Sequence, residues 1–212
     1  MELREPIICS VDVGAGRLNG ASGQYKKTLA EMAGLYADVP AFEAMLRRYG
    51  DEPVYEVTDL RPSSAAGDLI FGVTRMLPGK IGREYFFTRG HIHANANRPE
   101  IYYGESGSGV MLLESPQGET RALSIGAREI CYVPPYWIHR SINVGVSDLV
   151  MTFAYPADSG QDYEIIAKSV GMRSRVVDDG AGGWKLESNA SFSPRTQADI
   201  DALVGAPGTA SI

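Results

Sequence analysis

The chain has 212 residues, enough for one domain with its own core and too few to require two. Its hydrophobic content of 44% and charged content of 22% are ordinary for a soluble globular protein, and no apolar run approaches a membrane span in length. The formal net charge of −6 argues against nucleic acid as a partner, because a polyanion calls for a clustered basic face. A small anionic substrate is not excluded, since a few cations and backbone N–H groups suffice to bind one phosphate.

The start of the chain, residues 1–6, places acids and a proline where a signal peptide needs a basic and then an apolar stretch. We therefore expect a cytoplasmic protein that does not insert into a membrane. Neither Cys9 nor Cys131 belongs to a zinc knuckle or a redox pair. Both are predicted to be reduced, buried thiols.

The first predicted helix begins near Asp38 and Pro40 and ends at Gly50. Its apolar side chains recur at helical spacing and would cover one face. These side chains are Phe42, Met45, Leu46 and Tyr49.

From residue 54 onward, short strand-like segments alternate with turn residues at intervals of roughly ten residues, the pattern of an all-β sandwich or barrel. The predicted strands are 54–59, 69–76, 84–88, 101–104, 110–114, 120–124, 129–133 and 150–155. The predicted turns lie at 78–79, 107–109, 116–118 and 143–145. Short strands without intervening helices predict a closed double sheet of the jelly-roll type.

The three histidines of the chain all lie where metal ligands are expected. His91 and His93 are two residues apart in an extended stretch, so their imidazoles point to the same side. Glu100 follows after a loop-like connection, and His139 arrives from a distant strand-like stretch. A lone histidine is often a bystander, but this chain has no histidine elsewhere. Three imidazoles and one carboxylate predict a site for one divalent ion such as Fe, Mn, Ni, Co or Zn.

The C-terminal part contains an acidic, glycine-rich link at residues 178–183 and a predicted helix that starts after 193–194 and ends at Gly205. We therefore predict one domain over residues 1–172, including an N-terminal extension. Residues 173–212 are predicted to form a loosely packed C-terminal extension.

The ligand pattern resembles the cupin superfamily, in which one motif supplies two histidines and a glutamate and a second motif supplies the third histidine. Glu100 followed by Gly107 matches the end of the first motif, and His139 followed by Asn143 matches the end of the second. Two departures point to a subfamily. Six residues separate the second histidine from the glutamate, more than is common, and Tyr136 replaces a common glycine.

The subfamily that the chain resembles is the cupin-type glucose-6-phosphate isomerases. The similar segments cover most of residues 50–170, and the run 133–137 followed by His139 and Arg140 is highly specific. The resemblance implies a cupin (jelly-roll) double-stranded β-barrel with short flanking helices. It also implies a homodimer, to which the segments before residue 50 are expected to contribute.

The resemblance further implies where metal and substrate bind. The implied metal ligands are His91, His93, Glu100 and His139. The implied phosphate-binding residues are Thr74, Thr88 and Gly90, and the implied sugar-binding residues are Tyr55, Tyr102, Tyr155 and Tyr163. Hydroxyls and backbone N–H groups suit phosphate oxygens, and tyrosines offer a sugar both an apolar face and a hydroxyl. Core packing is the alternative role for each tyrosine.

The function implied by the resemblance is a metal-dependent interconversion of glucose 6-phosphate and fructose 6-phosphate, a step of glycolysis and gluconeogenesis. Such an isomerisation needs either a base that shuttles a proton or a Lewis acid that supports a hydride shift. Glu100 is the candidate base, with Tyr155 or Tyr163 as donor to the developing oxyanion. The alternative keeps Glu100 as a fixed ligand, because a carboxylate bound to a cation loses basicity. The expected ion is Fe²⁺, with Mn²⁺, Ni²⁺ or Zn²⁺ as alternatives.

One residue departs from the family, since Gln161 stands where archaeal members carry histidine. Glutamine exchanges no proton near neutral pH, which excludes an obligatory acid or base at this position. Three other functions stay open at this stage: a cupin dioxygenase with the same ligands, a sugar-binding protein without turnover, and an isomerase that also accepts mannose 6-phosphate.

Overall fold

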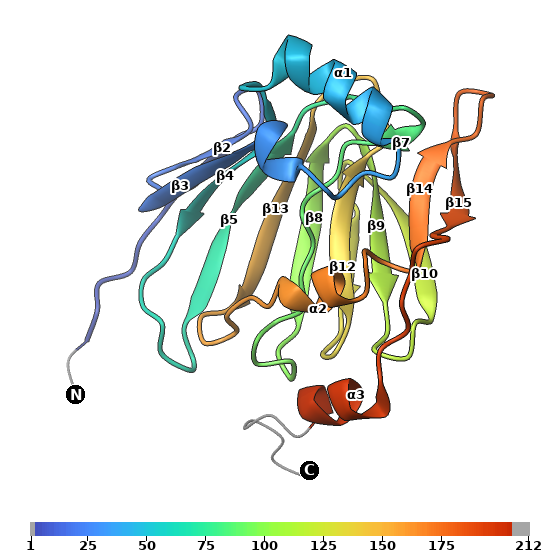
Figure 1. The fold of residues 1–212 in the computed structure, drawn as a ribbon. Coiled ribbons are helices and arrows are strands. Elements are labelled where there is room, and N and C mark those ends of the chain that lie inside the picture. Colours follow the sequence, from blue (N-terminus) through green and yellow to red (C-terminus); the bar gives the residue numbers. More distant parts are fainter. Residues whose placement is uncertain (1–2, 205–212) are drawn as a thin grey trace.

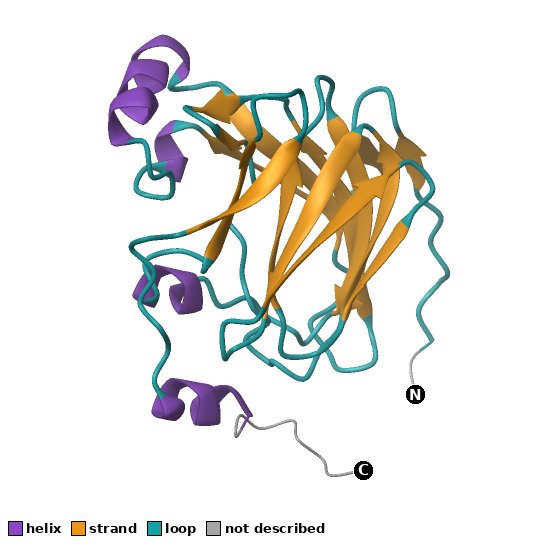
Figure 2. Cartoon of the chain, turned by 90° about the vertical axis from the view of Figure 1, so that its right-hand side faces the viewer, coloured by secondary structure: helices purple, strands orange, loops and turns teal. Residues whose placement is uncertain are grey.

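The computed structural model describes residues 3–204, and its centre is formed by antiparallel β-sheets that face each other (Figures 1 and 2). The larger sheet has six strands in the order β11 (Ile130–Val133), β8 (Glu100–Ser106), β13 (Leu149–Pro156), β5 (Leu69–Met76), β4 (Pro53–Leu60) and β3 (Gly23–Thr28). A three-stranded sheet follows the order β10 (Thr120–Gly126), β9 (Ser108–Glu114) and β12 (Ile138–Asn143). This is the all-β jelly-roll that the sequence predicts.

Two smaller sheets and short helices complete the chain. The four-stranded sheet has the order β15 (Trp184–Ser188), β14 (Ser174–Asp178), β7 (Glu84–Tyr85) and β6 (Lys80–Ile81), and a hairpin joins β1 (Ser10–Asp12) to β2 (Arg17–Asn19). The helices are a 3-10 turn at Ala30–Met32, α1 (Val39–Tyr49), α2 (Glu164–Lys168) and α3 (Gln197–Val204). Within residues 3–204, no helix has the length and apolar character that crossing a membrane requires.

The predicted first helix is confirmed as α1. The side chain of Asp38 accepts a hydrogen bond from the Ala41 N–H at 2.9 Å, which satisfies one free donor of the first turn. Proline also lies in that turn, and Gly50 forms the C-cap. The C-terminal helix is confirmed as α3, and its predicted end at Gly205 lies outside the described residues.

Several strands are absent from the prediction. The strands β1 to β3 precede residue 30, and β12 carries buried polar side chains that break the apolar alternation. Asn143 on β12, for example, donates to the carbonyls of Met76 and Ser147 at 2.9 Å each. Such long-range partners are not visible in a local sequence pattern.

The segment at residues 178–183 is the turn of the β14–β15 hairpin, not a link. The side chain of Asp179 accepts hydrogen bonds from the N–H groups of Ala181 and Gly183, which folds the turn back on itself. The loose packing of the C-terminal extension stays a prediction, and its described part makes a buried ion pair with β9. Arg195 Nη1 lies 2.6 Å from Glu114 Oε1, and both side chains are buried. The boundary at residue 172 stays a prediction.

The hydrophobic core lies between the two main sheets. Side chains from both sheets are fully buried there, among them Val54, Met76, Met111, Ile138 and Met151. Cys131 is buried as predicted, whereas Cys9 is partly exposed, and both are free thiols. Packing of this core holds the strands of the two sheets in fixed positions relative to each other.

Candidate metal centre and substrate cavity

Three stretches of chain bring the predicted metal ligands together. His91 and His139 pair across an antiparallel bridge, in which each N–H donates to the other carbonyl at 3.1 and 2.9 Å. Glu100 is the first residue of β8. His93 follows Ile92, whose backbone pairs with Asp162. Backbone pairing therefore brings the stretches that carry these side chains together.

One carboxylate oxygen lies at the centre of the cluster. Glu100 Oε2 is 2.9 Å from Nε2 of His139, 3.3 Å from Nε2 of His93 and 3.7 Å from Nε2 of His91. The ligand atoms of His91, His93 and Glu100 all lie within 4.8 Å of one another. All four side chains are buried.

The outer nitrogens of two imidazoles are fixed by backbone carbonyls. His93 Nδ1 contacts the Arg98 carbonyl at 2.8 Å, and His139 Nδ1 contacts the Trp137 carbonyl at 3.1 Å. Such contacts orient a metal-binding histidine so that Nε2 faces the ion. Nε2 of His91 and Nε2 of His93 are buried without a hydrogen-bond partner within residues 3–204. A divalent ion satisfies both atoms, so the residues present fit a metal.

Burial and mutual contact set the charge of the ligands. Burial, together with the neighbouring His139, lowers the pKa of His91 to about 4. Burial raises the pKa of the Glu100 carboxyl, but contacts with His139, His91 and His93 outweigh it and hold that pKa well below its usual range. Neutral imidazole and ionised carboxylate are the forms that bind a metal.

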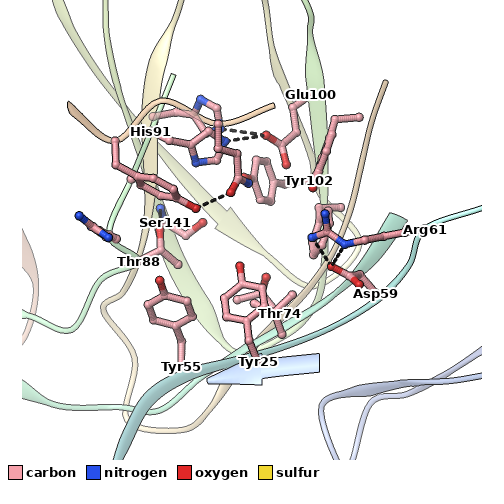
Figure 3. A pocket seen from close by; sticks show the side chains of 18 residues that line it. Tyr25, Tyr55, Asp59, Arg61, Thr74, Thr88, His91, Glu100, Tyr102 and Ser141 are labelled. Carbon is pink, nitrogen blue, oxygen red and sulfur yellow. Dashed lines mark hydrogen bonds and ion pairs between the residues drawn. The ribbon is translucent and has the colours of Figure 1, made fainter. Parts of the chain in front are cut away.

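A cavity opens from this cluster (Figure 3). It spans about 540 Å³, counting the solvent at its mouth. The lining contains all residues predicted to bind the substrate: Tyr55, Thr74, Thr88, Gly90, Tyr102, Tyr155 and Tyr163. His91, Glu100 and His139 line it as well.

Comparison with known proteins identifies the family. Residues 26–193 match the glucose-6-phosphate isomerase family. The chain belongs to this family.

Glucose-6-phosphate isomerase of Sinorhizobium medicae is 60% identical over 204 residues, which cover 96% of this chain and 95% of that protein. The enzyme of the same name from Thermococcus gammatolerans is 42% identical, with 91% of this chain and 100% of that protein covered. The one from Pyrococcus furiosus is 38% identical, with 88% and 96% covered. The resemblance recognised from the motifs is thereby confirmed.

Within this isomerase family member, the cavity tyrosines are neutral hydroxyl donors. Burial raises the pKa of Tyr155 to about 12 and raises the pKa of Tyr163 as well. Burial and the nearby Glu100 carboxylate raise the pKa of Tyr102 well above its usual value. A phenol with a raised pKa keeps its proton at neutral pH. These side chains can therefore donate to a substrate oxygen, but they are poor bases.

Gln161 lines the cavity together with Tyr163. The Tyr163 hydroxyl donates a hydrogen bond to Oε1 of Gln161, and the Arg89 guanidinium lies 4.7 Å from the centre of the Tyr163 ring. The amide therefore holds the tyrosine in place and leaves its own N–H₂ group as a donor.

Sequence reasoning missed several residues of the lining. These residues are Tyr25, Val57, Asp59, Arg61, Arg89, Ser141 and Phe153. Alternation along β4 was a usable signal, because Tyr55 and Asp59 share a face of the strand and Arg61, directly after its end, continues the even spacing into the cavity lining. Arg89 lies between two predicted phosphate-binding residues, which was a second signal.

Proposed function

We propose that this protein is a metal-dependent aldose–ketose isomerase that interconverts glucose 6-phosphate and fructose 6-phosphate. The observation that carries the proposal is the buried histidine–glutamate cluster at one end of a hydroxyl-lined cavity, in a chain that is 60% identical to a named isomerase. Family membership favours this function over a dioxygenase or a sugar-binding protein without turnover. Activity on mannose 6-phosphate and a cytoplasmic location stay predictions.

The residues proposed to hold the metal are His91, His93, Glu100 and His139. Fe²⁺ is the proposed ion, with Mn²⁺, Ni²⁺ or Zn²⁺ as alternatives, since mixed imidazole and carboxylate ligands suit all of these borderline ions. When bound, such an ion would supply Lewis-acid chemistry for the carbonyl of the open-chain sugar.

The remaining roles follow from the chemistry of the cavity wall. Hydroxyls and a backbone N–H are offered to the phosphate by Thr74, Thr88 and Gly90. Arg89 lines the cavity between Thr88 and Gly90 and adds a positive charge there. Within residues 3–204 its exposed side chain makes no ion pair with a carboxylate, so this charge is available to a phosphate. Tyr155 is proposed to donate to the oxyanion that develops on the sugar, and Tyr163 is proposed to do so once its hydroxyl turns away from Oε1 of Gln161. Tyr55 and Tyr102 are proposed to pack against the sugar chain.

The direct test is an assay of the purified protein after metal removal and reloading with one ion at a time. Conversion of fructose 6-phosphate is expected only in metal-loaded samples. Oxygen uptake by the iron-loaded protein, with no conversion of the sugar phosphate, would instead identify an oxidase or oxygenase.

Gln161→His tests whether the family departure limits the reaction. We expect the rate to change by less than about tenfold, whereas gain of an essential acid or base would raise it by roughly 10²- to 10⁴-fold. The reason is that Gln161 already positions Tyr163 through its amide oxygen. The measurement is the steady-state rate of the wild type and of Gln161→His at saturating metal. A rise of a hundredfold or more in the variant would contradict the expectation.

The assembly that we propose is a homodimer. The outer side of the large sheet carries exposed apolar residues on β8 and its edge partner β11: Ile101 is 43% exposed, Ile130 67% and Tyr132 56%. Exposed apolar groups on an edge strand favour association. Light scattering at micromolar concentration is expected to give twice the 22.9 kDa chain mass. A monomer at that concentration would contradict this assignment.

A further inference from the structure

The cavity wall contains an ion pair between Asp59 and Arg61, which belong neither to the proposed metal ligands nor to the proposed phosphate-binding residues. Oδ2 of Asp59 accepts hydrogen bonds from Nε and Nη2 of Arg61 at 2.9 and 2.6 Å. The Asp59 side chain is 2% exposed, whereas the Arg61 side chain is 48% exposed. Both residues line the same cavity as Glu100. A buried carboxylate therefore holds a half-exposed guanidinium at the wall of the proposed substrate site.

Two glycines on the neighbouring strands flank the Asp59 side chain. In the sheet register, Asp59 lies opposite Gly23 on one side and Gly72 on the other. A Cβ at Gly23 would approach Oδ1 of Asp59 to 2.5 Å, and a Cβ at Gly72 would approach Cβ of Asp59 to 2.8 Å. Oδ1 is buried and accepts no hydrogen bond within residues 3–204. The carboxylate thus has little room to move, and its charge is balanced by Arg61.

The hydrogen bonds to Asp59 leave specific donors of Arg61 available. With Nε and one N–H of Nη2 engaged, the two N–H groups of Nη1 have no partner within residues 3–204. In Figure 3 the guanidinium extends from the β4 side toward the middle of the cavity, opposite Thr88 and Ser141. An arginine fixed in this way loses little conformational freedom when a ligand oxygen accepts from it.

The charge around Arg61 determines which ligand oxygen suits it. Asp59 cancels the charge of Arg61, and a phosphate dianion placed there would lie close to a buried carboxylate that repels it. A neutral hydroxyl meets no such repulsion and gains a charge-assisted hydrogen bond. Arg89, by contrast, makes no ion pair with a carboxylate within the described residues 3–204 and lies between Thr88 and Gly90 in the sequence. The two arginines therefore offer different chemistry on different sides of one cavity.

We propose that Arg61, positioned by Asp59, binds hydroxyl groups of the sugar chain and makes the cavity selective for a polyhydroxylated substrate rather than for any phosphate ester. This assignment rests on the proposed function. It makes Arg61 a substrate-binding residue and Asp59 a positioning residue, and it leaves the phosphate on the Thr88 side.

The test compares the Michaelis constant for fructose 6-phosphate with the competitive inhibition constant of inorganic phosphate. In Arg61→Met the Michaelis constant is expected to rise about 10- to 100-fold, the range for losing a hydrogen bond to a charged group. The inhibition constant of phosphate is expected to stay within about twofold, since a neutralised arginine contributes little to phosphate binding. Arg89→Met is expected to raise both constants. Asp59→Asn is expected to raise the Michaelis constant more than it lowers kcat.

Controls separate this proposal from the loss of fold or of function. Arg121→Met changes an exposed arginine on β10, outside the cavity, and is expected to behave as the wild type. An unchanged Michaelis constant in Arg61→Met would refute the assignment, and so would an equal rise in both constants, which would make Arg61 a phosphate contact. If the wild type binds fructose 6-phosphate without converting it, the isomerase proposal fails. Calorimetric dissociation constants for the same variants and ligands then decide the role of Arg61.

Discussion

A protein in which His91 and His93 are both replaced by alanine is expected to lose its bound metal and its isomerase activity together. The two imidazoles have buried, unpartnered Nε2 atoms, and the chain has no histidine besides these two and His139. Loss of the partners that merely orient a metal ligand costs roughly 10- to 100-fold in affinity. Loss of two ligands is expected to cost more than about 100-fold, with activity falling in parallel.

Elemental analysis after dialysis against metal-free buffer measures the occupancy of this variant. A matched control replaces Arg121 and Leu123 by alanine, which are also two residues apart on a strand but lie on the exposed side of β10. The control is expected to keep its metal and its activity. Full metal occupancy in the double histidine variant would refute the proposed site.

The clustering of the proposed metal ligands was predictable because histidine is rare in this chain and its spacing is informative. An H-x-H pair in an extended stretch fixes a common direction for two imidazoles, and the motif around His139 supplied the third. The fold class was predictable for a similar reason, since turn residues recur between short strands. Local capping chemistry at Asp38 and Gly50 likewise placed α1 correctly.

What could not be predicted depends on pairing between distant segments. The bridge between His91 and His139 places these two residues side by side, yet it joins residues far apart in the sequence. The polar strand β12 is stabilised by partners such as the carbonyl of Met76, which no local pattern reveals. The space occupied by the Asp59 side chain likewise depends on Gly23 and Gly72, which lie opposite it in the sheet register. Sheet register is a tertiary property, so the residues that it brings together escape a sequence pattern.

The variant Glu100→Gln is expected to lower turnover of fructose 6-phosphate by at least the roughly 10²- to 10⁴-fold attributed to general acid–base catalysis. Glutamine has nearly the shape of glutamate but carries no charge and cannot accept a proton near neutral pH. Glu100 is the carboxylate that all three imidazoles approach, and it lines the cavity. The substitution therefore removes both a ligand charge and the candidate base.

Metal occupancy in this variant separates the two roles of Glu100. Comparable occupancy with abolished turnover would identify the carboxylate as the base, because the ligand set then survives without it. Parallel loss of metal and turnover would instead assign Glu100 chiefly to holding the ion. Glu105→Gln is the matched control, since Glu105 lies on the same strand and accepts a hydrogen bond from Thr152 at 2.7 Å, outside the cavity lining. Turnover retained in Glu100→Gln would overturn the assignment of Glu100 as base and favour a hydride shift at the metal, since the carboxylate that contacts the three imidazoles would then be dispensable for proton transfer.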